Sequence, residues 1–278
     1  MKKTYIVAVC LAVVIAAANA QELQLSGGFD YGIVFYDVDN SFLAPFGYGS
    51  DFYVSQKSKS LFLAPGISFM MRIYPEKPAN ALGVSGFFFR DRMLLVTNAK
   101  ETGDVTVALP NSSFLWQNEW VTSYTEKVSR EWALSGGGAV IIIGDFAMGL
   151  TSKLDLSERF SFIADIGVNI TIASFIYDAL AANENDTLMY TGAGLFDELG
   201  LQINLTKTIY LELGFNVTLN FIAYQEGEVT FPSPRNNGEY KKVKYEDTGR
   251  SDLGAVAPYL HIGWRIDFKP LKDAGLIR

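Results

Sequence analysis

The stretch from Val256 to Phe268 is the strongest constraint on how this chain folds. Alternate residues are mainly apolar, and the residues between them are mostly small or polar. This period of two predicts a β-strand with one apolar and one mixed polar face. Its thirteen residues (268 − 256 + 1) are many for a soluble strand, whereas a tilted strand crosses a bilayer with about 9 to 11 residues. The stretch therefore predicts a strand that spans a membrane.

Seven further stretches have the same alternation. They lie at about Glu22–Tyr36, Lys59–Tyr74, Ala81–Arg90, Gly138–Leu154, Phe160–Tyr177, Leu188–Leu205 and Ile209–Tyr224. In the third, Leu82, Val84 and Phe88 are expected to share the apolar face, and the pattern fades near Arg90. Short turns are expected at residues 75–80, 155–159 and 206–208, and long loops at 37–58, 91–137, 178–187 and 225–252. The connections therefore alternate between short and long.

An even number of such strands predicts an all-β fold, a closed antiparallel eight-stranded transmembrane β-barrel. Closure is expected because an open sheet edge in lipid would leave backbone groups without hydrogen bonds. A ten-stranded barrel is the alternative if Val105–Leu109 and Phe114–Tyr124 enter the membrane instead of forming a projecting hairpin. A secreted, soluble, lipocalin-like barrel would point the same apolar residues inward. The many small residues on the polar faces favour the membrane barrel.

The N-terminus has the features of a secretory signal peptide. Lys2 and Lys3 precede an apolar run that ends at a small-residue cleavage site after Ala20, so residues 1–20 are the predicted signal peptide. Residues 21–268 are then the barrel, and 269–278 a periplasmic tail. Cys10 is the one cysteine, so the mature chain is expected to have neither disulfides nor thiolate metal sites. Loss of the two lysines changes the formal charge from −7 to −9, which argues against nucleic acid as a partner.

Charged residues on the polar faces predict an ion-pair network inside the barrel. An eight-stranded barrel has room for little more than side chains, so charges buried there must pair. The expected members are Asp30, Arg72, Asp145, Lys153, Asp165, Glu198, Glu212, His261, Arg265 and Asp267. Counting from the short-turn ends places Glu212 and Arg265 at similar depth on neighbouring strands, which predicts a salt bridge between them.

His261 is the one histidine and has two interpretations. It could act as a catalytic base, but no Ser or Asp lies two residues from it to form a dyad. An interior position in the polar network is favoured. We therefore expect no enzyme activity, no cofactor and no metal site.

The sequence from His261 to Phe268 resembles the C-terminal β-signal of outer-membrane proteins, with Gly263, Ile266 and the aromatic Phe268 in the recognised positions. The resemblance implies recognition by the barrel-assembly machinery of a Gram-negative-type envelope. The chain departs from the pattern by continuing from Lys269 to Arg278. Its strand layout is similar to small outer-membrane barrels of the OmpX, OmpW and OmpA transmembrane kind, which implies an outer-membrane location, lipid contact and surface-exposed loops.

Two functions are compatible with such a barrel. The external loops could serve surface interaction or envelope structure; alternatively, the acid-rich lumen could be a narrow channel for small solutes. Trp116, Trp120 and Trp132 in or near the longest loop could bind a ligand or host surface, or pack the hairpin. Aromatic residues at the strand ends are expected to form the interfacial girdles: Tyr31, Phe35, Tyr177, Tyr210, Tyr224, Trp264 and Phe268.

Overall fold

The computed structural model of the chain describes residues 21–45, 51–75, 85–108, 113–116, 119–133, 139–178, 185–232, 240–247 and 250–268. The predicted signal peptide and the tail from residue 269 lie outside these ranges and stay predictions. No described helix is long and apolar enough to cross a membrane.

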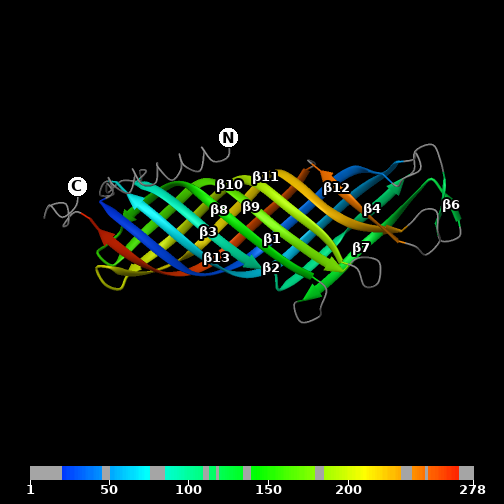
Figure 1. Cartoon of the computed structure of the whole chain (residues 1–278). Coiled ribbons are helices and arrows are strands. Elements are labelled where there is room, and N and C mark those ends of the chain that lie inside the picture. Colours follow the sequence, from blue (N-terminus) through cyan, green and yellow to red (C-terminus); the bar gives the residue numbers. More distant parts are fainter. Residues whose placement is uncertain are drawn as a thin grey trace.

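Eight strands close into an antiparallel barrel (Figure 1). Their order is β1 (Glu22–Pro45), β13 (Arg250–Asp267), β11 (Ile209–Pro232), β10 (Asn185–Asn204), β9 (Phe160–Asp178), β8 (Ala139–Asp155), β3 (Gly86–Leu95) and β2 (Asp51–Tyr74). The ring closes because β2 also pairs with β1 along the whole of both strands. The first and last strands pair from Glu22 opposite Asp267, which confirms the predicted closure at the opening strand.

The register around the ring gives the strands their tilt. A path across paired residues that starts at Phe35 returns to the same strand at Leu25, a shift of 35 − 25 = 10 residues. The path runs through Gly254, Leu219, Leu195, Val168, Met148, Phe89 and Met71. A stagger of this kind requires strands tilted by roughly 40° to the barrel axis.

The outer surface carries a continuous apolar belt. Phe29 is 73% exposed and Ile166 is 63% exposed, whereas the neighbours Asp30 and Asp165 are buried. The same alternation occurs on all eight strands of the ring. Because the apolar side chains point outward, the lipocalin-like alternative is wrong. The belt is instead suited to lipid.

Several predicted loops are strand. The outer parts of β1 and β2 pair without interruption from Asp37 opposite Lys59 to Pro45 opposite Asp51, where a loop at 37–58 was expected. A strand of 24 residues is roughly 80 Å long, or about 60 Å along a tilted axis, against an apolar band of about 25 Å. The barrel wall therefore continues well beyond the membrane.

The third strand differs most from expectation. Phe87 faces outward and Phe88 is fully buried, the reverse of the predicted phase. The strand does not fade at Arg90 but runs to Leu95, with Arg90 and Arg92 pointing inward. Charged residues on the inner face broke the apolar pattern without ending the strand.

The predicted projecting hairpin is confirmed. β4 (Asn98–Ala108) continues β3 beyond Val96 and Thr97 and pairs with both β2 and β7 (Ser123–Ala133). Its tip carries the short strands β5 (Phe114–Trp116) and β6 (Glu119–Val121), and β12 (Tyr240–Asp247) extends the far end of β11. None of these segments inserts between neighbours of the eight-stranded ring, so the ten-stranded alternative is wrong.

Candidate functional site

Arg72 is the centre of the barrel interior. Its guanidinium donates to Asp165 Oδ2 at 2.9 Å, to Glu198 Oε1 at 2.8 Å and to Glu212 Oε2 at 2.7 Å. These carboxylates come from β9, β10 and β11, across the lumen from β2. All four side chains are completely buried. One cation therefore ties opposite walls of the barrel together.

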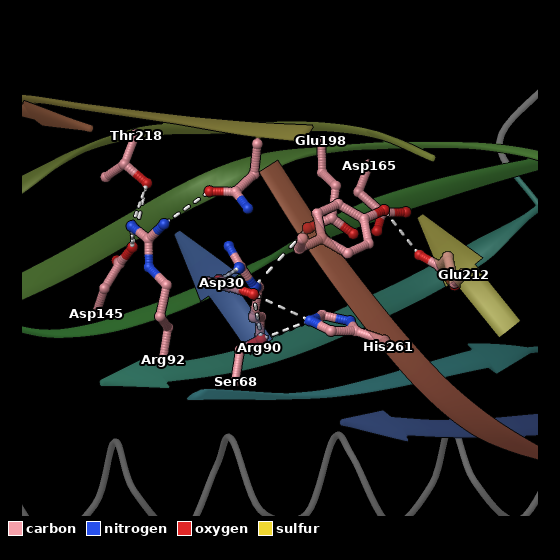
Figure 2. Close-up of polar contacts among 12 residues, drawn as sticks. Asp30, Ser68, Arg90, Arg92, Asp145, Asp165, Glu198, Glu212, Thr218 and His261 are labelled. Atoms are coloured by element: carbon pink, nitrogen blue, oxygen red, sulfur yellow. Dashed lines mark hydrogen bonds and ion pairs between the residues drawn. The ribbon is translucent and has the colours of Figure 1, made fainter. Parts of the chain in front are cut away.

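A second cluster lies beside the first and contains His261 (Figure 2). Arg90 forms an ion pair with Asp30, and its guanidinium also lies over the Phe196 ring at 5.1 Å. Ser68 Oγ donates to Asp30 Oδ1 at 2.8 Å, and His261 Nε2 lies 2.7 Å from Ser68 Oγ and 3.1 Å from Asp30 Oδ1. His261 thus joins an interior network, as predicted.

The third cluster lies nearer the outer end. Arg92 donates to Asp145 Oδ2 at 2.5 Å, to Asn216 Oδ1 at 2.7 Å and to Thr218 Oγ1 at 3.0 Å. Thr218 Oγ1 in turn donates to Asp145 at 3.1 Å. Figure 2 shows this cluster beside the Arg90 cluster, with both arginines reaching into the lumen from β3.

Ion pairs continue to the periplasmic end of the interior. Lys153 Nζ lies 3.1 Å from Glu22 Oε1, and Arg265 Nε lies 3.2 Å from the same oxygen. Arg265 also donates to Asn204 Oδ1 at 3.0 Å. The predicted Glu212–Arg265 salt bridge is therefore wrong: Glu212 stands opposite His261 in the register, four residues up the strand from Arg265.

Asp267 is also corrected. It is the last residue of β13 and is exposed at the rim, so it is not part of the buried network. The prediction placed it inward from alternation alone, but a strand end at the rim meets water. The other predicted members lie inside: Asp30, Arg72, Asp145, Lys153, Asp165, Glu198, Glu212 and His261 are buried, and Arg265 is partly so.

Arg90 and Arg92 are the interior residues that sequence reasoning missed. They supply two of the three buried guanidinium groups. Their spacing of two was the available signal, because a strand continued in the phase of Phe88 puts both on one face.

An apolar layer closes the interior above the charged clusters. On β1, Val34 and Tyr36 follow Asp30 toward the outer end, and on β8, Ile141 and Ile143 precede Asp145. The layer consists of Val34, Tyr36, Phe62, Ala64, Leu94, Val96, Ile141, Ile143, Ala173, Phe175, Tyr190, Leu253 and Ala255. The Tyr36 and Phe175 rings stack at 5.1 Å, and Gln225 donates to Tyr36 Oη at 2.6 Å. The lumen is therefore filled by charge below and by apolar side chains above.

The clusters do not have the arrangement of a hydrolytic site. A Ser–His–Asp relay uses one ring nitrogen for the serine and the other for the carboxylate. Here Nε2 contacts both Ser68 and Asp30, and Nδ1 has no hydrogen-bond partner in the described structure. Within the described residues no group of three or more His, Cys, Asp or Glu side chains could hold a metal ion.

Gly263, Ile266 and Phe268 are the residues of the predicted assembly signal. Gly263 stands opposite Tyr210, and a Cβ atom added to Gly263 would overlap the Tyr210 ring. Ile266 faces outward, and the Phe268 N–H donates to the Gln21 carbonyl at 2.8 Å. Gly263 thus has a packing role in the barrel, while recognition by the assembly machinery stays a prediction.

A closed barrel with an apolar belt and a filled polar interior is a transmembrane β-barrel of the bacterial outer-membrane type. Lipid is the medium that its belt contacts.

No protein-family model matches the chain, and no curated protein matches it. Among solved structures, the chain is similar to the attachment invasion locus protein Ail of Yersinia pestis, with 10% identity and a TM-score of 0.38 over 89% of this chain and 99% of Ail. It is similar to OprG of Pseudomonas aeruginosa, with 14% identity and a TM-score of 0.43 over 90% of this chain and 98% of OprG. AlkL, solved in DMPC bilayers, has 12% identity and a TM-score of 0.38 over 88% of this chain and 91% of AlkL. The likeness is one of fold alone.

Proposed function

We propose that this protein acts in surface interaction through its extracellular strands, and that its barrel is a closed membrane anchor. The observation that carries the proposal is the filled interior. Arg72 bridges three strands on the far wall with no solvent exposure, and the apolar layer lies above it. The outer ends of the strands are then the part of the protein free to meet a partner.

The filled interior argues against the channel alternative. An ion in transit would have to displace buried ion pairs and then enter a layer of apolar side chains, where an unpaired charge is strongly disfavoured. An excess of interior acids, which had favoured cation passage, is offset by Arg72, Arg90, Arg92 and Lys153. We therefore propose no transport of small solutes.

The outer sheet is defined as residues 37–45 of β1, 51–60 of β2, β4 and β7. Its outward surface is polar where the belt ends: Asp37 pairs with Lys59 at 3.5 Å and Asp39 with Lys57 at 3.4 Å, all with exposed side chains. The change from apolar belt to exposed ion pairs marks the membrane surface. The outer sheet beyond it is a wide, hydrogen-bonded surface that faces the cell's surroundings.

A non-enzymatic role is part of the proposal. The one Ser–His–Asp grouping is completely buried and has the wrong nitrogen geometry for a relay. Substrate has no described route to it.

Conductance in planar bilayers tests the proposal. Protein whose folding is verified by the mobility shift between unboiled and boiled gels should give no single-channel steps. A known porin reconstituted in parallel should give steps and so establishes that the assay works. Discrete, reproducible steps from the folded protein would overturn the closed-anchor proposal.

A further inference from the structure

β7 is an open edge of the outer sheet. It pairs with β4 from Ala133 opposite Asn98 to Ser123 opposite Ala108, and the sheet order ends at β7. Among the described strands, β4 is the one ladder partner of β7. An edge strand of 11 residues presents a row of backbone donors and acceptors that another strand can pair with.

The sequence of β7 is self-complementary when read against itself in the antiparallel direction. With Val128 opposite Val128 of a second copy, Glu126 stands opposite Arg130 and Tyr124 opposite Trp132, each twice. The same register matches the whole strand end to end, because Val128 is its midpoint. Opposite charges and aromatic pairs in facing positions stabilise a sheet. Registers centred on Glu126, Lys127, Arg130 or Glu131 would place like charges against each other.

The symmetry of such a pair fixes where the second copy sits. Neighbouring antiparallel strands are related by a twofold axis perpendicular to their sheet. In the outer sheet this direction is perpendicular to the barrel wall, and it is therefore parallel to the membrane. A half-turn about such an axis inverts the barrel. The second copy must then be anchored in an opposing membrane.

We propose that β7 pairs with β7 of a second copy on a facing membrane, so that the protein joins two cell surfaces by homotypic adhesion. This inference rests on the proposed function, since it names the partner of the outer sheet. From Ala133 to Val128 the strand rises about 13 Å. The pair therefore forms between closely apposed surfaces, and long surface polysaccharide should prevent it.

Outer-membrane vesicles test the proposal because they keep the native orientation. Vesicles from a strain without long surface polysaccharide, carrying the full chain, should cluster in a light-scattering assay, and vesicles without the protein should not. Glu126→Arg and Arg130→Glu each place like charges in facing positions, so each variant alone should lose clustering. A mixture of the two variants restores opposite charges at every position and should cluster again.

Cysteine cross-linking tests the register and the arrangement in the two membranes. Residues directly opposite in an antiparallel pair are close enough for a disulfide. Val128→Cys alone should give disulfide-linked dimers. Glu126→Cys and Arg130→Cys should give them only when vesicles of one variant are mixed with vesicles of the other. The chain without an introduced cysteine is the control.

Several results would overturn the proposal. Clustering by either charge variant alone, or failure of the mixture to cluster while both variants remain folded by gel shift, excludes the facing pair. Dimers from Ser129→Cys but not Val128→Cys exclude the register. Cross-links within a single, highly diluted vesicle population exclude facing membranes. Loss of homotypic adhesion would leave the closed-anchor proposal standing, because that proposal is tested separately by conductance.

Discussion

At the scale of single residues, the barrel depends on a few fully buried cations. Arg72 contacts three carboxylates that have no water to replace it. Removing one partner of a buried ion pair is much more destabilising than losing an exposed one, because the remaining charges stay buried and unpaired.

Replacement of Arg72 by Ala should therefore lower the free energy of unfolding by at least about 3 to 5 kcal/mol or prevent folding. Urea unfolding in detergent, followed by the gel shift, measures the change. Arg265→Ala is the matched control: its partner Glu22 lies at the rim, so the loss should stay below about 1 kcal/mol. Equal effects of the two substitutions would contradict a central role for Arg72.

Gly263 provides a second prediction at this scale. Gly263→Ala should slow or weaken folding in purified lipid because the new methyl group overlaps the Tyr210 ring. Gly144→Ala is the control, since its added Cβ would meet one backbone oxygen at 3.7 Å.

Combining Gly263→Ala with Tyr210→Leu should restore refolding in purified lipid. If the double variant folds in lipid but fails to assemble in cells, Gly263 also has a role in recognition by the assembly machinery. Normal refolding of Gly263→Ala alone would contradict the packing role.

At the scale of single strands, alternation is a strong determinant. Glu198 on β10 is buried in the network, while its neighbour Asp197 is exposed on the outer face beside Leu195. Two adjacent acids thus meet opposite environments.

Asp197→Val should raise the free energy of unfolding by about 1 kcal/mol, because a lipid-facing charge is removed. Glu198→Val should lower it, since Arg72 and Arg90 lose a partner. Thermal unfolding of both variants in the same lipid gives the comparison. Changes of the same sign would mean that the facing of β10 is misassigned.

Strands with clean alternation could be predicted from sequence, and those with buried charge could not be followed to their ends. β9 and β11 have unbroken alternation and were placed within a few residues over the membrane. β3 was misread because Phe88 is an inward apolar residue and two arginines follow it. The Glu212–Arg265 error arose because depth was counted from turns, while the pairing register depends on the tilt of the strands. Sequence also gives no measure of how far a polar strand continues beyond lipid.

At the scale of the whole molecule, the ring and the hairpin are separable. The eight strands of the ring pair with one another without β4 and β7. The hairpin adds surface and not closure.

Replacing residues 98–133 with a short Gly-rich turn should leave a barrel that still shifts mobility on boiling, with little change in its unfolding temperature. The same variant should lose vesicle clustering, because the β7 edge is gone. A matched variant that lacks only the tip, residues 109–122, should keep both properties. Failure of the larger deletion to fold would show that the hairpin stabilises the ring.

The strands that cross the membrane continue into the outer sheet. β1 and β2 each run 24 residues and remain paired from the periplasmic rim to the outer end. An adhesive domain on a flexible linker must lose orientational freedom when it binds, which weakens the complex. Here the binding surface is preorganised at a constant angle to the bilayer, so that loss is met during folding. Affinity should consequently depend on the angle at which two surfaces meet, with flat apposition favoured over contact between strongly curved membranes.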